Sequence, residues 1–356
     1  MANLSKVLRL LLAAGVAAVV WEGAARVDDY IAYDAPLLEP YNPEILYTND
    51  ALGKCGKPHA RYVKWRFNSL GYRSPELDPK RMHIITLGAS ETFGLYESEN
   101  GEYPRQLETE INARAGGPLY QVVNAAYPGL SNNGIVRRLP VILSSIRPRV
   151  AVIYPSLANY ISISGDRNAI PMADPVSPYE SRVAGKIKTV LKKVLPAWVQ
   201  TELRNLEIAR DTRGVKVLDR LPEENAAVFR RELAAVVEGL EADGVRVVLV
   251  THATRFGERV TPEERPMLLA WRKFYPSLGE GAFLDMEFRL NEVIRQEASA
   301  RGIALADAAR LMPSGPRYFA DFVHFTDAGA RAMASILSAQ LQPILAAEST
   351  RVAREK

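Results

Sequence analysis

The sequence predicts an α/β protein of flavodoxin-like type, with three layers built on a five-stranded parallel sheet. Short apolar runs alternate along the chain with longer amphipathic stretches, as strands and helices do in this class. The strongest runs are apolar without interruption, which indicates strands buried on both faces. The expected strands cover residues 82–87, 120–124, 149–154, 245–251 and 302–306, and the expected helices cover 102–115, 132–146, 222–242, 283–301 and 326–345.

Composition limits the classes of function. The 356 residues are 47% apolar and 24% charged, which is typical of a packed globular protein and too apolar for a disordered one. The 45 basic and 41 acidic residues are interspersed, so we expect no nucleic-acid surface, while the net charge of +4 allows a weak attraction to anionic lipid or polysaccharide. The single cysteine, Cys55, excludes an intrachain disulfide, and the four histidines lack metal-ligand spacing. We therefore expect no metal and no cofactor.

The first 25 residues have the pattern of a targeting segment. Lys6 and Arg9 precede an apolar run that ends at Trp21, and the length of the segment suits either a membrane-spanning anchor or a signal peptide. Gly23-Ala24-Ala25 resembles a cleavage site, whereas Trp21 is typical of a residue at the membrane interface. We favour an uncleaved anchor over a cleaved signal. The basic residues before the run would leave the rest of the chain outside the cytoplasm, whether anchored or secreted.

One serine follows the first expected strand in a turn. The apolar run 84–87 ends at Gly88, and Ser90 comes two residues later. A glycine permits a tight strand-to-helix turn, and a serine there can direct its hydroxyl out of the sheet edge where α/β proteins bind their ligands. An ordinary turn or helix cap is the alternative interpretation of such a serine.

A carboxylate and a histidine near the end of the chain suit that serine. Asp321 lies three residues before His324, just ahead of the last expected helix. Serine needs a base to become a nucleophile, and the base needs an acceptor that fixes its tautomer. Residues 124–129 and 154–159 follow two further strands and offer donors for an oxyanion.

These four blocks, in this order, resemble the SGNH/GDSL hydrolase superfamily over roughly residues 66–345, with a poor match at about 160–220. The resemblance implies that Ser90 is the nucleophile, His324 the base and Asp321 its partner. It also implies that the Ser90 amide, the Gly129 amide and the Asn159 side chain hold the oxyanion. Ala89 and Tyr160 depart from the pattern, which usually has aspartate at both positions; the catalytic groups themselves are retained.

The remaining segments surround the expected domain of residues 81–346. Residues 26–80 are expected to be an extended lead-in with short strands, and 347–356 a polar tail. The stretch 161–220 breaks the α/β pattern, and we expect an inserted lid of one or two helices over the oxyanion side. Its lysines at 186, 188, 192 and 193 suit a solvated helix face, or a contact with substrate or membrane.

Three other residues are candidates for substrate contact. Asn68 and Arg73 belong to a stretch that looks like the lead-in of secreted or anchored bacterial relatives, and either line the mouth of the site or pin a surface loop. His252 follows the fourth expected strand. It has three interpretations: a substrate contact, a hydrogen-bonded residue at the strand end, or a catalytic base in place of His324. Unlike His324, it has no carboxylate three residues away.

Two functions from different classes follow. The first is a serine esterase or acyltransferase acting on an ester-bearing small molecule or glycan; in anchored relatives the substrate is often an acetylated glycan. The second is a non-catalytic envelope scaffold or glycan-binding protein that keeps the fold. The presence of all five predicted catalytic groups favours the enzyme.

Overall fold

The computed structural model describes residues 2–161, 180–257 and 260–355, with a parallel sheet at its centre. Five strands lie in the order β6-β5-β7-β8-β9, and each neighbouring pair is parallel. In chain order this is 2-1-3-4-5, the flavodoxin-like order, so the predicted fold class is confirmed. The strands are β5 (Met82–Gly88), β6 (Tyr120–Asn124), β7 (Val150–Tyr154), β8 (Arg246–Val250) and β9 (Ala304–Ala306).

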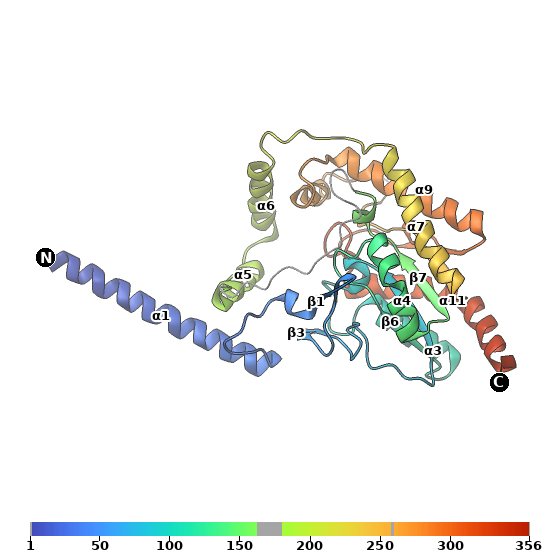
Figure 1. The fold of residues 1–356 in the computed structure, drawn as a ribbon. Helices are drawn as coiled ribbons and strands as arrows, with labels where there is room; N and C mark the ends of the chain where they lie inside the picture. Colours follow the sequence, from blue (N-terminus) through green and yellow to red (C-terminus); the bar gives the residue numbers. More distant parts are fainter. Residues whose placement is uncertain (1, 162–179, 258–259, 356) are drawn as a thin grey trace.

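Helices cover both faces of this sheet, which explains why most residues of its strands are apolar and buried (Figure 1). Side chains alternate between the faces: Ile85 and Leu87 pack with α4, α7 and α9, whereas Ile84 packs with α3 and α11. The long helices are α3 (Tyr103–Ala115), α4 (Asn132–Ile146), α7 (Glu224–Ala242), α9 (Glu280–Arg301) and α11 (Asp327–Glu355). Short helical elements are α2 (Ser90–Phe93), α8 (Arg265–Leu269), α10 (Ala308–Leu311), η1 (Pro43–Leu46), η2 (Leu157–Asn159) and η3 (Ala270–Lys273).

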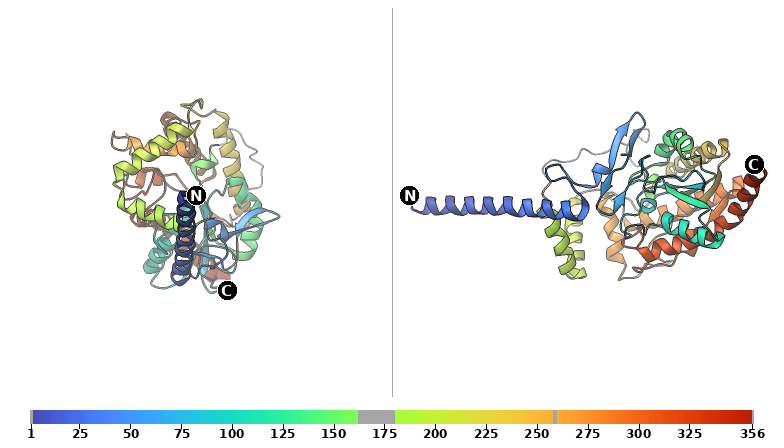
Figure 2. Two further views of the ribbon diagram at one scale, coloured as in Figure 1. Left: turned by 90° about the vertical axis from the view of Figure 1, so that its left-hand side faces the viewer. Right: turned by 90° about the horizontal axis from the view of Figure 1, so that it is seen from below.

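The N-terminal helix is longer than expected. α1 (Ala2–Tyr33) projects from the rest of the molecule, and its stretch Lys6–Tyr33 is long and apolar enough to cross a membrane (Figure 2). The expectation that 26–33 would be extended was wrong. Glu22 and Arg26, one helical turn apart, form an ion pair at 2.9 Å that supports the helix across the expected boundary. Beyond it, the lead-in forms two antiparallel hairpins, β1 (Tyr47–Asp50) with β2 (Gly53–Gly56) and β3 (Arg61–Tyr62) with β4 (Trp65–Arg66).

The C-terminal end also differs from expectation. Residues 347–355, expected as a polar tail, continue α11. Glu348 is buried there, and its carboxylate pairs with Arg351 at 3.0 Å and with Arg246 at 3.4 Å. The prediction that the helix ends near residue 345 was wrong, and the ion pairs of the buried Glu348 support its continuation.

We expected one or two helices in the insert, and its described part contains α5 (Arg182–Val194) and α6 (Ala197–Asp211). α5 packs against α1, and α6 packs against α8 and η3. Residues 162–179, which directly follow the Asn159 block and would cover the oxyanion side, lie outside the described residues. A lid over the site therefore stays a prediction.

Candidate active site

The turn after β5 fixes the position of Ser90. A Cβ atom at Gly88 would lie 2.2 Å from Thr92 Oγ1 and 2.7 Å from the Tyr154 carbonyl oxygen, so only glycine fits between α2 and β7. Ser90, half-buried, is the first residue of α2. Its hydroxyl therefore lies at the carboxyl edge of the sheet, beside the point where the strand order reverses.

Two buried side chains hold the other end of α2. Arg73 donates to the carbonyls of Phe93 and Gly94 and pairs with Glu102 at 2.8 Å. Asn124, at the end of β6, donates through Nδ2 to the Thr92 carbonyl at 3.0 Å. The last carbonyls of α2 are thus satisfied by side chains from two other segments, which makes the serine turn rigid.

Asp321 and His324 form the expected pair. Asp321 Oδ2 lies 2.8 Å from His324 Nδ1, and Asp321 Oδ1 accepts hydrogen bonds from the backbone N–H groups of Val323 and His324, both at 2.9 Å. The neighbouring Phe322 and Phe325 are buried and anchor the loop. Among the described residues, His324 Nε2 has no hydrogen-bond partner although it is buried. The arrangement leaves Nε2 available as the acceptor of a proton.

Glu91 is a site residue that the sequence did not reveal. Its side chain is 3% exposed, and it accepts from the Ser90 hydroxyl at 3.1 Å and from the Ser156 hydroxyl at 2.8 Å. Its Oε1 lies 3.4 Å from His252 Nε2. Burial acts to raise its pKa, but the hydrogen bond from His252 and the charges of His324 and His252 outweigh burial and lower the pKa to about 2. Glu91 is therefore a buried anion in direct contact with the candidate nucleophile.

The loop after α2 adds further groups around His324. The Tyr96 ring packs edge-on against the imidazole, with centroids 5.5 Å apart. Glu97 is 1% exposed, and its burial raises its pKa to about 7. Burial also disfavours the imidazolium of His324, but the hydrogen bond and charge of Asp321, and the charges of Glu91 and Glu97, prevail and raise the pKa of His324. These carboxylates stabilise the histidine once it has taken up a proton.

The predicted oxyanion donors also lie at strand ends. Gly129 has φ +82°, which favours glycine, and a Cβ there would meet open space. Among the described residues, neither the Ser90 nor the Gly129 backbone N–H donates a hydrogen bond. Both amides thus remain free to bind a negatively charged oxygen.

Asn159 has an unexpected partner, Asn132. Asn159 Nδ2 donates to Asn132 Oδ1 at 2.7 Å, while Asn159 Oδ1 and Asn132 Nδ2 are buried without partners in the described part of the chain. Exchanging O and N in both amides preserves the hydrogen bond and turns the unpartnered atom of Asn159 into an N–H donor. An oxyanion at that position would favour the exchanged arrangement.

The three candidates for substrate contact are held by the protein instead. His252 is fully buried, its ring stacks on Tyr154 with centroids 5.3 Å apart, and its backbone N–H donates to Asn291. Asn68 is buried and caps its own loop by accepting from the N–H groups of residues 70 and 72. Arg73 is buried and bound to the carbonyls at the end of α2 and to Glu102. Burial and internal hydrogen bonds favour the structural interpretation of all three residues, and a substrate contact stays a prediction.

The chain is similar to several solved structures at low sequence identity. No family model and no curated protein matches it. TesA is 15% identical with a TM-score of 0.42, covering 74% of this chain and 99% of that one. The lipase/acylhydrolase from Enterococcus faecalis is 16% identical with a TM-score of 0.44, covering 74% and 96%. A putative lipolytic protein of the G-D-S-L family from Desulfitobacterium hafniense DCB-2 is 12% identical with a TM-score of 0.42, covering 73% and 100%.

Proposed function

We propose that this chain is a serine ester hydrolase of the SGNH type, with Ser90 as nucleophile and His324 as base. The observation that carries the proposal is the Asp321–His324 pair at 2.8 Å, whose outward nitrogen Nε2 has no partner among the described residues. A histidine held in this way is arranged to accept a proton from a hydroxyl. The order of the four sequence blocks supports the same assignment.

In the proposed reaction, Ser90 Oγ turns from Glu91 toward His324 and attacks the ester carbonyl. His324 Nε2 takes the hydroxyl proton, and the carbonyl oxygen becomes an oxyanion that accepts from the Ser90 and Gly129 amides and from Asn159. Collapse of the tetrahedral intermediate breaks the ester C–O bond, and the imidazolium returns its proton to the leaving alkoxide. Water then attacks the acyl-enzyme with His324 again as base, which releases the acid and regenerates Ser90.

Glu91 has two roles in this scheme. It accepts from the Ser90 hydroxyl before reaction and so keeps Oγ in one orientation. Its negative charge favours the imidazolium, which exists only after the proton has moved to His324. Glu91 is thereby a positioning residue that also favours the charged intermediate.

We propose that the natural substrate carries O-acyl groups on a glycan or another ester of the cell envelope, with transfer to a second hydroxyl as the alternative to hydrolysis. α1 supports an anchor in the membrane, and the basic residues before its apolar run support an extracytoplasmic catalytic domain. A secreted form would arise if the segment were cleaved.

The test is turnover of p-nitrophenyl acetate by the full chain in detergent, compared with Ser90→Ala. We expect turnover by the wild type and none above background by the variant, with equal thermal stability. Equal turnover by both proteins would contradict the proposal. Absence of turnover and of serine labelling in the wild type would favour the non-catalytic envelope scaffold.

A further inference from the structure

The helix α5 has an apolar face that is largely exposed. Its apolar residues at 183, 187, 190, 191 and 194 follow the i, i+4, i+7, i+8 and i+11 spacing of one helix face. Ile187, Val190 and Val194 are 54%, 56% and 72% exposed. A contiguous apolar face of this kind marks an interaction surface.

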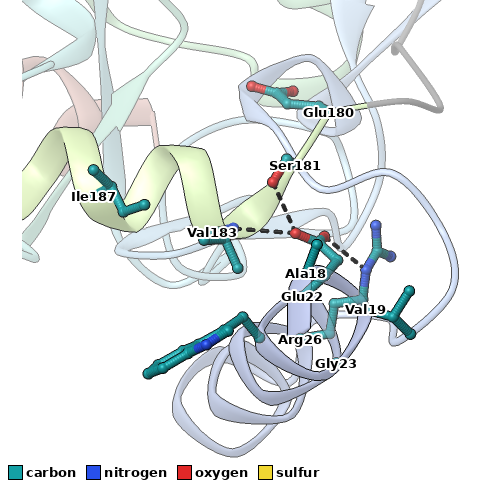
Figure 3. A pocket seen from close by; sticks show the side chains of 10 residues that line it. Ala18, Val19, Glu22, Gly23, Arg26, Glu180, Ser181, Val183 and Ile187 are labelled. Atoms are coloured by element: carbon teal, nitrogen blue, oxygen red, sulfur yellow. Dashed lines mark hydrogen bonds and ion pairs between the residues drawn. The ribbon is translucent and has the colours of Figure 1, made fainter. Parts of the chain in front are cut away.

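Glu22 of α1 attaches the start of α5 at the residue directly after the apolar run of α1. Its carboxylate accepts from the Ser181 hydroxyl at 2.8 Å and from the Val183 backbone N–H at 3.2 Å (Figure 3). It also accepts from the backbone N–H of Arg182 at 3.1 Å. These N–H groups are the unsatisfied donors of a helix N-terminus, which a carboxylate binds well. α5 is therefore fixed at the level where the apolar part of α1 ends.

The polar side chains of α5 contact residues that follow Glu22 in the sequence, away from the apolar run of α1. Lys186 pairs with Asp28 at 2.7 Å and with Asp29 at 2.6 Å, both beyond Glu22 along α1. Arg182 donates to the carbonyls of Pro36 and Glu39, further along the chain. These contacts fix the rotation of α5 about its own axis.

The apolar face of α5 is directed toward residues of α1 that precede Glu22. Val183 and Ile187 line a recess of about 960 Å³ together with Ala18, Val19 and Trp21 of α1, which precede Glu22 (Figure 3). Val19 and Trp21 are 73% and 68% exposed. Apolar residues of α1 and α5 thus line the same recess, whose lining also includes the ion pair of Glu22 with Arg26.

We propose that α5 is an interfacial helix that lies in the surface of the bilayer entered by α1, with its apolar face on the acyl chains. This rests on the membrane anchoring proposed above. On a helical wheel, Lys186 and Lys188 fall outside the apolar face, on its flanks, where they suit anionic headgroups. The insert then holds the catalytic domain at the membrane surface in a fixed orientation.

The test measures contact with lipid at single residues of the full chain. In a Cys55→Ser background, Val190→Cys on the apolar face and Thr189→Cys on the opposite face each carry an environment-sensitive fluorophore. The protein is reconstituted into vesicles of phosphatidylcholine and phosphatidylglycerol, with or without a nitroxide on the acyl chains. Thr189, exposed and adjacent in sequence, is the matched control. We expect at least about threefold stronger quenching at 190 than at 189, because an interfacial helix immerses only its apolar face.

A third label, at Val16→Cys, separates this proposal from the anchor on which it depends. Quenching at 16, with equal quenching at 189 and 190, would overturn the interfacial helix and leave the anchor intact. Quenching at none of the three sites would overturn both. Protection of residue 190 from aqueous iodide without quenching by lipid nitroxide would overturn the proposal in favour of a protein covering this face.

Discussion

Replacing Asp321 by Asn tests the role of Asp321 as the partner of the proposed base, His324, without disrupting the loop that holds both residues. Asp321 Oδ1 accepts from two backbone N–H groups at 2.9 Å, and the amide oxygen of asparagine can keep both bonds. The partner of His324 Nδ1 changes from a carboxylate oxygen at 2.8 Å to an NH₂ group. Since that group donates, it favours the tautomer with the proton on Nε2, which cannot accept the serine proton.

The expected loss of kcat in Asp321→Asn is large. In a serine triad, replacing the aspartate by asparagine lowers kcat by about 10⁴, or about 5 kcal/mol of transition-state stabilisation. The pKa of His324 should also fall, because Asp321 is the strongest of the groups that raise it. The acidic limb of the residual activity should therefore move to lower pH.

The assay is kcat/KM for p-nitrophenyl acetate between pH 5 and 9, using the full chain in detergent. Asp327→Asn is the matched control: the Asp327 carboxylate accepts from the backbone N–H and hydroxyl of Ser98, and in the described part of the chain no hydrogen bond joins it to the His324 ring. We expect the control to stay within about threefold of wild type, as loss of a helix N-terminal charge costs less than about 1 kcal/mol. Activity of Asp321→Asn within the same range would remove Asp321 from the site and leave Ser90 and His324 as a dyad.

Three further substitutions test the surrounding groups. Glu91→Gln removes a negative charge that favours the imidazolium, so the acidic limb of kcat/KM should move down by about one pH unit; an unchanged limb would refute this role. Glu97→Gln should raise the free energy of unfolding above pH 7 by up to about 3 kcal/mol and change it little near pH 4.5. The reason is that the buried carboxylate of Glu97 ionises, at a cost to the folded state, only as the pH rises from 4.5 to about 7. Urea unfolding at both pH values measures the difference, and an equal effect of the substitution at both would contradict it. Asn159→Ala should lower kcat by about 10²–10³ with little change in melting temperature, whereas unchanged kcat would exclude it from the oxyanion site.

The sequence was sufficient for the sheet and for the Asp321–His324 pair. Largely apolar runs correspond to β5 and β7, and a three-residue spacing let the carboxylate of Asp321 reach the following imidazole. Parallel strands then bring the residues after each strand to one edge, whatever their separation along the chain.

The role of Glu91 was not predictable in the same way. Its two other partners, Ser156 and His252, lie 65 and 161 residues away, and nothing local indicates that they converge. One signal was available: an acidic residue directly after the serine, in a turn that is otherwise small or apolar. The pairing of Asn159 with Asn132 depended on a tertiary contact in the same manner. The extension of α1 past residue 25 is supported by the local pair of Glu22 with Arg26 and by the tertiary pairs of Asp28 and Asp29 with Lys186.

The most direct test of the proposed catalytic site is to ask which residue a fluorophosphonate modifies. Full-length protein in detergent is treated with the reagent, and the adduct is located by peptide mass spectrometry. We predict one adduct per chain, on Ser90, with labelling abolished in Ser90→Ala and strongly slowed in His324→Ala because the hydroxyl then lacks its base. An adduct on another residue, or equal labelling of wild type and Ser90→Ala, would contradict the proposed catalytic site.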